Sequence, residues 1–259
     1  MMLEGRVAIV SGVGPGLGRS TALGLAREGA DIVFAARTKS ALDSVAEEVA
    51  SLGRQPLVVP TDISKEADAE ALADRTHQRF GRIDILINNA FAQGPYETVI
   101  DSNVDEWRET VDIGLVGTMC MCKYVARYMI EGGSGAIVNV TSLSMRRGIQ
   151  LRSAYSAAKA GITLLSQSLA DELGRHGIRV NCLAPGHIWS DKLRGFYETR
   201  AEMLGKTYDE VYAMYAGETA LKRIPAADEI AAAIVFLASD MASAITGQSL
   251  DANAGNFFH

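Results

Sequence analysis

Residues 7–18 decide the fold, and they read Val7-Ala8-Ile9-Val10-Ser11-Gly12-Val13-Gly14-Pro15-Gly16-Leu17-Gly18. A short apolar run, a glycine turn and the start of a helical pattern form the first half of a βαβ unit. Glycines let the backbone turn sharply and approach a pyrophosphate, and a helix N-terminus favours the negative charge. The spacing Gly-x-x-x-Gly-x-Gly in this context predicts dinucleotide binding at Gly12, Gly14, Gly16, Leu17 and Gly18. A merely tight turn is the alternative.

Apolar runs alternate with helical patterns along the rest of the chain, as in stacked βαβ units. Strands are predicted at 7–10, 31–35, 57–59, 83–87, 136–140 and 179–183. Helices are predicted at 18–28, 40–52, 66–80, 104–129, 154–174 and 227–239. We expect one domain over residues 1–259, an α/β fold with a doubly wound parallel sheet of the Rossmann type. Its ligand should lie at the carboxyl ends of the strands.

Composition excludes several classes of protein. The 259 residues are 48% hydrophobic, and the net charge of -6 argues against nucleic acid as the main partner. We expect no metal site, because the four histidines are scattered. No apolar stretch is long enough to span a bilayer, and the three cysteines are typical of a reducing compartment. We therefore expect no membrane partner and a cytoplasmic location.

The segment from Ser190 to Ile224 interrupts the βα alternation. It carries five aromatic residues and two methionines mixed with charges, without a strand pattern. It is too long for a simple connection unless it forms helices of its own or a lid. We expect a substrate lid at about 190–224.

The end of the second strand indicates which cofactor binds. A site selective for NAD usually has Asp or Glu there, whereas this chain has Ala36-Arg37-Thr38-Lys39. A guanidinium can bind a 2'-phosphate with two hydrogen bonds, so Arg37 favours NADP over NAD. Arg37 could instead stack on adenine or pair with a helix carboxylate.

Three side chains form the predicted catalytic set. Tyr155 and Lys159 are four residues apart and share one helix face, and Ser142 follows the fifth predicted strand. A nearby positive charge favours phenolate, which suits proton transfer to or from an alcohol oxygen. The hydride itself belongs to the cofactor. Alone, Tyr-x-x-x-Lys is also common as a surface pair.

Together these features resemble the short-chain dehydrogenase/reductase family in its single-domain form, from about Gly5 to about Asp251. The resemblance is carried by Gly12, Gly16, Gly18, Asp62, Asn88-Asn89-Ala90, Ser142, Tyr155, Lys159, Asn181 and Pro185-Gly186. It implies about seven strands and a homodimer or homotetramer built through the helices at 104–129 and 154–174. It further implies that Ser142 bonds the substrate oxygen and Lys159 holds the nicotinamide ribose. The remaining cofactor contacts that it implies are Asp62, Ile63, Asn88, Ala90, Pro185, Gly186, Ile188 and Ser190.

The chain departs from the family pattern at three positions. Phe91 stands where glycine is frequent, and Ser11 stands in place of threonine. Gly114 stands where the family has an Asn that holds a water in the proton relay to the lysine. The missing side chain leaves room for a second water, so we expect catalysis to survive, slower or with a different pH dependence.

The substrate class is the most open question. The aromatic segment favours a bulky apolar or cyclic secondary alcohol or ketone, although such residues also serve as plain packing. A 3-oxoacyl-thioester reductase is an alternative, since Arg146, Arg147 and Arg152 could meet a carrier phosphate or belong to a solvated loop. His187 could touch substrate or be structural. A nucleotide-binding sensor or scaffold with weak catalysis is the alternative of another class. An enoyl reductase is disfavoured, because its Tyr and Lys are spaced more widely.

Overall fold

The computed structural model describes residues 1–258, apart from the side chains of 39–41. Its seven strands form one parallel sheet in the order β3-β2-β1-β4-β5-β6-β7. The strands are β1 Val7–Ser11, β2 Asp31–Ala36, β3 Pro56–Pro60, β4 Ile85–Asn88, β5 Gly135–Val140, β6 Ile178–Pro185 and β7 Ser249–Ala252. The predicted single-domain, doubly wound parallel sheet is confirmed. The chain order reverses between β1 and β4, which is where such a sheet opens a crevice for a ligand.

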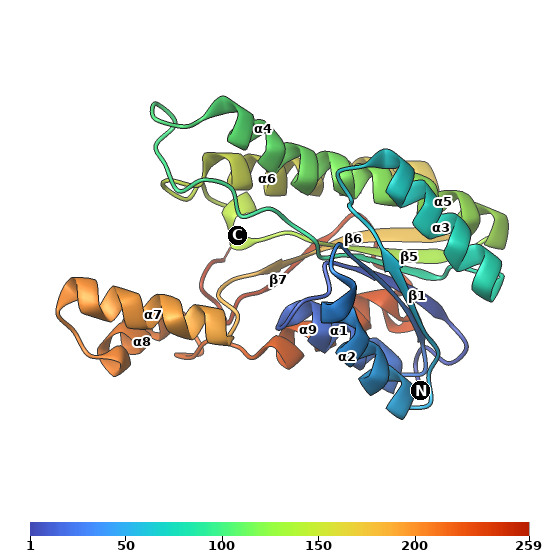
Figure 1. Ribbon diagram of the computed structural model, residues 1–259, viewed down its shortest axis with the longest axis horizontal. Helices are drawn as coiled ribbons and strands as arrows, with labels where there is room; N and C mark the ends of the chain where they lie inside the picture. Colours follow the sequence, from blue (N-terminus) through green and yellow to red (C-terminus); the bar gives the residue numbers. More distant parts are fainter. Residues whose placement is uncertain (259) are drawn as a thin grey trace.

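Helices cover both faces of the sheet (Figure 1). One face carries α1 Leu17–Arg27, α2 Lys39–Ser51 and α9 Ala227–Ala238, and the other carries α3 Glu66–Phe80, α4 Val104–Val111, α5 Gly117–Gly132 and α6 Ser153–Gly174. Each face has its own apolar core. Leu25 and Ile234 belong to the first core, and Leu72 and Met121 belong to the second. Strands β1 and β4 are buried along their whole length because both faces are covered.

The helix predicted at 104–129 is interrupted. A π-helical turn, Asp112–Val116, separates α4 from α5, and Gly114 is buried at its centre. Single π turns inside helices are frequent at functional sites, because they change the direction of backbone groups. Helical periodicity predicts the helix but not this extra residue in the turn.

The segment predicted as a lid forms two helices, α7 Asp191–Leu204 and α8 Tyr208–Gly217, which project away from the sheet (Figure 1). Thr207 and Glu210 form a reciprocal capping box at the start of α8. Buried Tyr197 of α7 and Val211 of α8 pack with other tyrosines of α8 and with Trp189. The aromatic residues of this segment therefore serve largely as the core of a helical hairpin.

No helix within residues 1–258 combines the length and the apolar character needed to cross a membrane.

Candidate functional site

The glycine turn lies at the carboxyl end of β1, beside a cleft of about 730 Å³. Gly12 has φ +72°, and a Cβ there would come within 2.5 Å of the backbone of Ala90. Gly14 and Gly16 differ, because a Cβ on either would meet no atom within 4 Å. Gly12 thus allows two backbone segments to touch, while Gly14 and Gly16 leave open space before the N-terminus of α1. That arrangement fits the pyrophosphate of a dinucleotide.

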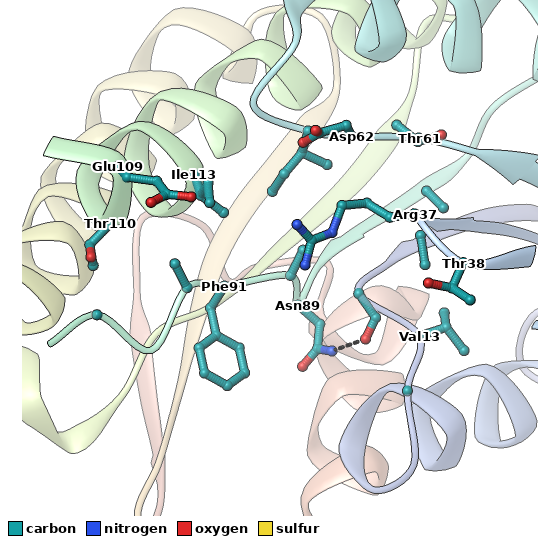
Figure 2. Close-up of a pocket in the computed structure, with 18 of the residues that line it drawn as sticks. Val13, Arg37, Thr38, Thr61, Asp62, Asn89, Phe91, Glu109, Thr110 and Ile113 are labelled. Atoms are coloured by element: carbon teal, nitrogen blue, oxygen red, sulfur yellow. Dashed lines mark hydrogen bonds between the residues drawn. The ribbon is translucent and has the colours of Figure 1, made fainter. Parts of the chain in front are cut away.

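Six of the predicted cofactor residues line this cleft, namely Gly12, Gly14, Arg37, Asp62, Ile63 and Ala90. Figure 2 shows the Arg37 side chain extending into it. Asp62 accepts hydrogen bonds from the backbone N–H and hydroxyl of Ser64, at 3.1 and 2.7 Å. The hydroxyl bond of Ser64 is the main reason that the pKa of Asp62 is lowered, and the charge of Arg37 adds to it. The carboxylate of Asp62 is therefore fixed by Ser64 and is close enough to Arg37 for the charge of Arg37 to act on it.

The side chains of the neighbouring residues Asn88 and Asn89 lie in different surroundings. Asn88 points into the core and donates to Asn139 Oδ1 at 2.9 Å. Asn89 instead lines the cleft and donates to the carbonyl of Gly12 at 2.8 Å (Figure 2). Successive side chains of a strand point to opposite faces, so only one of the two can reach the cleft. Of the two side chains, only that of Asn89 reaches the cleft, and contact between Asn88 and a cofactor stays a prediction.

The remaining predicted cofactor residues do not line this cleft, although they lie at the same end of the sheet. Leu17 and Ile188 pack against the first core, and Gly18 packs against the carbonyl of Gly12. Pro185 ends β6, and a Cβ on Gly186 would lie 3.1 Å from Asn253 Cβ. Ser190 caps α7, its hydroxyl accepting from the N–H of Leu193 at 3.2 Å. Their contact with a cofactor stays a prediction.

Ser142, Tyr155 and Lys159 lie close together beside the end of β5. Ser142 follows β5, and its hydroxyl is close enough to the phenol of Tyr155, in the first turn of α6, to act on the pKa of that phenol. Lys159 lies one turn further along α6, with Nζ 5.7 Å from the centre of the Tyr155 ring. Lys159 is buried and donates to the carbonyl of Val140 at 2.6 Å. A serine, a phenol and an ammonium thus meet beside the end of β5.

The pKa shifts of Tyr155 and Lys159 differ from the simple expectation that a nearby positive charge favours the phenolate. Burial raises the pKa of the Tyr155 phenol, and the nearby Ser142 hydroxyl and the charge of Arg152 oppose that rise. Burial, and to a smaller extent the charge of Arg152, lower the pKa of Lys159 to about 8. Arg152 is therefore a second cation beside the phenol, in addition to Lys159.

Gly114 faces the start of α6. Its carbonyl accepts a hydrogen bond from the hydroxyl of Thr118 at 2.7 Å, and a Cβ there would lie 3.2 Å from Ala158 Cβ. The free space between Gly114 and α6 is narrower than the absence of a side chain suggests, because α6 packs closely against the π-helical turn. An Asn at this position would require a shift of a few tenths of an ångström.

Sequence patterns did not single out several residues that line the cleft or surround Tyr155. Phe91 packs edge-on to Tyr155, with ring centres 6.0 Å apart, and the carboxylates Glu106 and Glu109 of α4 line the far side of the cleft. Their sequence neighbourhood carries no motif. Only the resemblance pointed to Phe91, as an unusual residue after Asn-Asn-Ala.

The three arginines between Ser142 and Tyr155 have different surroundings. Arg146 forms an ion pair with Asp251 at 3.1 Å, and Arg147 is exposed. Arg152 lies 4.0 Å above the centre of the Tyr155 ring. They therefore do not form one basic patch. His187 is hydrogen-bonded through Nδ1 to the Tyr197 hydroxyl at 2.8 Å, which agrees with the alternative that His187 is structural.

Comparison with known proteins agrees with this geometry. A family model described as Enoyl-(Acyl carrier protein) reductase matches residues 12–256. The chain is 39% identical to the short chain dehydrogenase/reductase astE of Aspergillus oryzae, over 98% of this chain and 95% of that one. It is 37% identical to the cis-4-hydroxycyclohexanecarboxylate dehydrogenase of Sinomonas cyclohexanicum, over 96% of each.

A solved carveol dehydrogenase from Mycobacterium avium, in complex with NAD, superimposes with a TM-score of 0.92 at 28% identity and covers 98% of both chains. These relatives extend over nearly the whole chain, in agreement with the cleft and the Ser142, Tyr155 and Lys159 cluster. The chain belongs to the short-chain dehydrogenase/reductase family and is an NAD(P)-dependent oxidoreductase that acts on CH–OH groups.

Proposed function

We propose that this enzyme interconverts a bulky apolar or cyclic secondary alcohol and its ketone, with NADP as the preferred cofactor. In the reducing direction, ketone, NADPH and a proton give alcohol and NADP⁺. When bound, the cofactor supplies or accepts the hydride at the carbinol carbon. The chain has to bind both molecules, orient them and move one proton.

Tyr155 is the proposed acid/base, and this is the step on which the proposal depends. The proximity of Ser142 to Tyr155 brings a second hydroxyl near the point where a substrate oxygen would accept the phenol proton. Ser142 would hold that oxygen, and Lys159 and Arg152 would stabilise the phenolate left behind. The observation that carries the function is this hydroxyl pair, with two cations beside the phenol, at the carboxyl edge of the sheet.

Lys159 has a second proposed part. Its ammonium reaches the carbonyl of Val140, at the end of β5, and is buried there. From that position it would hold the nicotinamide ribose and exchange the proton between Tyr155 and solvent. Pro185, Gly186, Ile188 and Ser190 would border the carboxamide.

The preference for NADP rests on Arg37. Its side chain enters the cleft directly after β2, where an acidic residue would repel a 2'-phosphate. The side chain of the nearby Lys39 lies outside the described residues and carries no part of the proposal.

A cyclic substrate is supported by the 37% identical relative named for a hydroxycyclohexanecarboxylate. Oligomerisation through α5 and α6 is supported by exposed apolar side chains on or beside these helices, namely Val116, Met119 and Leu164. We infer a homodimer or homotetramer. A cytoplasmic location stays a prediction of the sequence.

The test is a panel of cyclic and steroidal ketones, keto sugars and 3-oxoacyl thioesters, assayed with NADPH and NADH in parallel. Cyclic ketones should give the highest kcat/KM, and NADPH should be preferred over NADH. Arg37→Gln should weaken NADPH binding by about 10- to 100-fold, the value of a charge-assisted pair of hydrogen bonds, and leave NADH unchanged. A preference for NADH would contradict the role of Arg37, and a preference for thioesters would contradict the substrate class.

A further inference from the structure

Arg152 is held in an unusual position beside the catalytic tyrosine. Its guanidinium carbon lies 4.0 Å from the centre of the Tyr155 ring and 4.8 Å from that of Tyr96. One nitrogen, Nη2, donates to the carbonyl of Gln93 at 3.3 Å. Its Nε is buried and has no hydrogen-bond partner. The guanidinium therefore contacts two aromatic rings and has one donor unused.

Among the described residues, Arg152 also has no counter-charge. In the described part of the chain, no carboxylate pairs with it. Arg146, six residues earlier on the same loop, is paired with Asp251. A partly buried guanidinium is costly to leave without an anion, and buried donors are rarely left unbonded. Both features point to a ligand that completes the site.

A second cation approaches the same point from the lid. Lys192, in the first turn of α7, donates to the side-chain oxygen of Gln93 at 2.9 Å. Gln93 in turn donates to the Tyr96 hydroxyl at 2.8 Å. Gln93 thus carries two positive side chains, one from the catalytic loop and one from the lid, and it contributes no negative charge to balance them.

We propose that Arg152 and Lys192, organised by Gln93 and Tyr96, bind a carboxylate of the substrate, so that the enzyme acts on a small cyclic oxo or hydroxy acid. This inference rests on the proposed function, since it uses Tyr155 as the group that contacts the reacting oxygen. The carboxylate accepts hydrogen bonds from the guanidinium of Arg152 and the ammonium of Lys192, while the carbonyl oxygen accepts from Tyr155.

The position of Arg152 also limits the size of the substrate. The guanidinium lies over the face of the Tyr155 ring, and the phenol oxygen lies at the end of that ring. The carbonyl and the carboxylate are then separated by a distance comparable to one six-membered ring. In a 3-oxoacyl carrier thioester, the whole pantetheine arm separates the ketone from the phosphate. Arg152 is thus too near the reacting carbon to serve a carrier phosphate.

A different role for Arg152 would be to stabilise the Tyr155 phenolate alone, through its charge and its contact with the ring. The two roles differ in their dependence on substrate. A phenolate stabiliser would affect every ketone equally, whereas a carboxylate ligand would affect only substrates that carry the anion.

The experiment compares 4-oxocyclohexanecarboxylate with its neutral carboxamide, using NADPH and the full chain. The wild type should prefer the carboxylate by about 10- to 100-fold in kcat/KM, as a charge-assisted hydrogen-bonded pair implies. Arg152→Gln should abolish this preference: the carboxylate rate should fall by about 10- to 100-fold more than the carboxamide rate, which loses only the contribution of Arg152 to the phenolate. Arg152→Lys should retain part of it. Arg147→Gln is the matched control, because Arg147 is exposed on the same loop, and it should leave both rates unchanged.

A binding measurement gives a readout that does not need turnover. Calorimetry with the NADP⁺-saturated enzyme and cyclohexanecarboxylate should show binding that Arg152→Gln weakens by at least about tenfold. An equal loss of both rates in Arg152→Gln, or no binding of cyclohexanecarboxylate to the wild type, would overturn the carboxylate site. If neutral ketones are reduced with no preference for the acid, this inference fails and the proposed function stands. If no ketone of any class is reduced, the proposed function fails.

Discussion

The cofactor cleft and the catalytic cluster lie at the same edge of the sheet but are built differently. The shape of the cleft depends mainly on close backbone contacts, such as the contact between Gly12 and Ala90. At the cluster, side chains from separate loops and helices hold one another, as where Arg152 stacks on Tyr155. A mutation at the cleft should therefore change its shape, whereas a mutation in the catalytic cluster should change the reaction rate. Mutations in the two regions should therefore have separable effects.

The largest effect should come from Tyr155→Phe. Loss of the acid/base hydroxyl should lower kcat by about 10³-fold or more, within the usual range for general acid–base catalysis, while NADPH affinity changes by less than about threefold. Steady-state kinetics and fluorescence titration of NADPH measure the two quantities. Tyr128→Phe, which removes a hydroxyl bonded to Asp74 on the protein surface, is the control. A parallel loss of NADPH binding in Tyr155→Phe would show that the two regions are not separable.

Gly12→Ala should break the cleft and not the chemistry directly. The added Cβ meets the Ala90 backbone at 2.5 Å and occupies a left-handed backbone conformation, which together should cost about 3 kcal/mol of unfolding free energy. Gly53→Ala is the matched control, because Gly53 also has positive φ but no atom within 4 Å of the new Cβ. It should cost only about 1 kcal/mol. Equal losses of unfolding free energy for the two variants, measured by urea denaturation, would contradict the close approach of Gly12 to Ala90.

The buried ammonium of Lys159 should make stability depend on pH. Because its pKa in the folded chain is about 8, below the ordinary value of 10.5, the unfolded chain binds more protons between these pH values. The unfolding free energy should therefore rise with pH across that window, and the burial penalty is fully present below pH 8. The gain between about pH 7 and about pH 9.5 should be about 2 kcal/mol relative to Lys159→Met. A flat difference between the two proteins would mean that Lys159 is not buried as a charge.

Gly114 should give the smallest effect. Gly114→Asn restores the residue that the family pattern has, but its Cβ crowds Ala158, so about 1 kcal/mol of stability should be lost. Turnover should change by only about threefold, with a shifted pH profile, because an Asn amide would replace a water in the relay. Gly114→Ala carries the same crowding without the amide. Identical pH profiles for the Asn variant and the wild type would show that the position is silent.

Local patterns predicted the part of the molecule that depends on local structure. Buried apolar runs and helical periodicity gave the order of strands and helices, and the glycine turn predicted the position of the cleft. The spacing of Tyr155 and Lys159 predicted their shared helix face. The resemblance supplied the seventh strand and the partnership with Ser142.

The features that sequence missed depend on tertiary contacts. Which of Asn88 and Asn89 faces the cleft is decided by where β4 ends, and one residue of shift reverses it. The π-helical turn at Gly114 has no signal in helical periodicity. The sequence does not distinguish Arg152 from other loop arginines, because its contact with the Tyr96 ring, 56 positions earlier, forms only in the folded chain.

Transfer of deuterium from NADPH labelled at the nicotinamide C4 tests the central claim most directly. The wild-type enzyme with a cyclic ketone should give an alcohol with one deuterium at the carbinol carbon, detected by mass spectrometry, and Tyr155→Phe should suppress this product. Binding of NADPH without any labelled alcohol across the ketone panel would contradict the account and favour a nucleotide-binding sensor or scaffold.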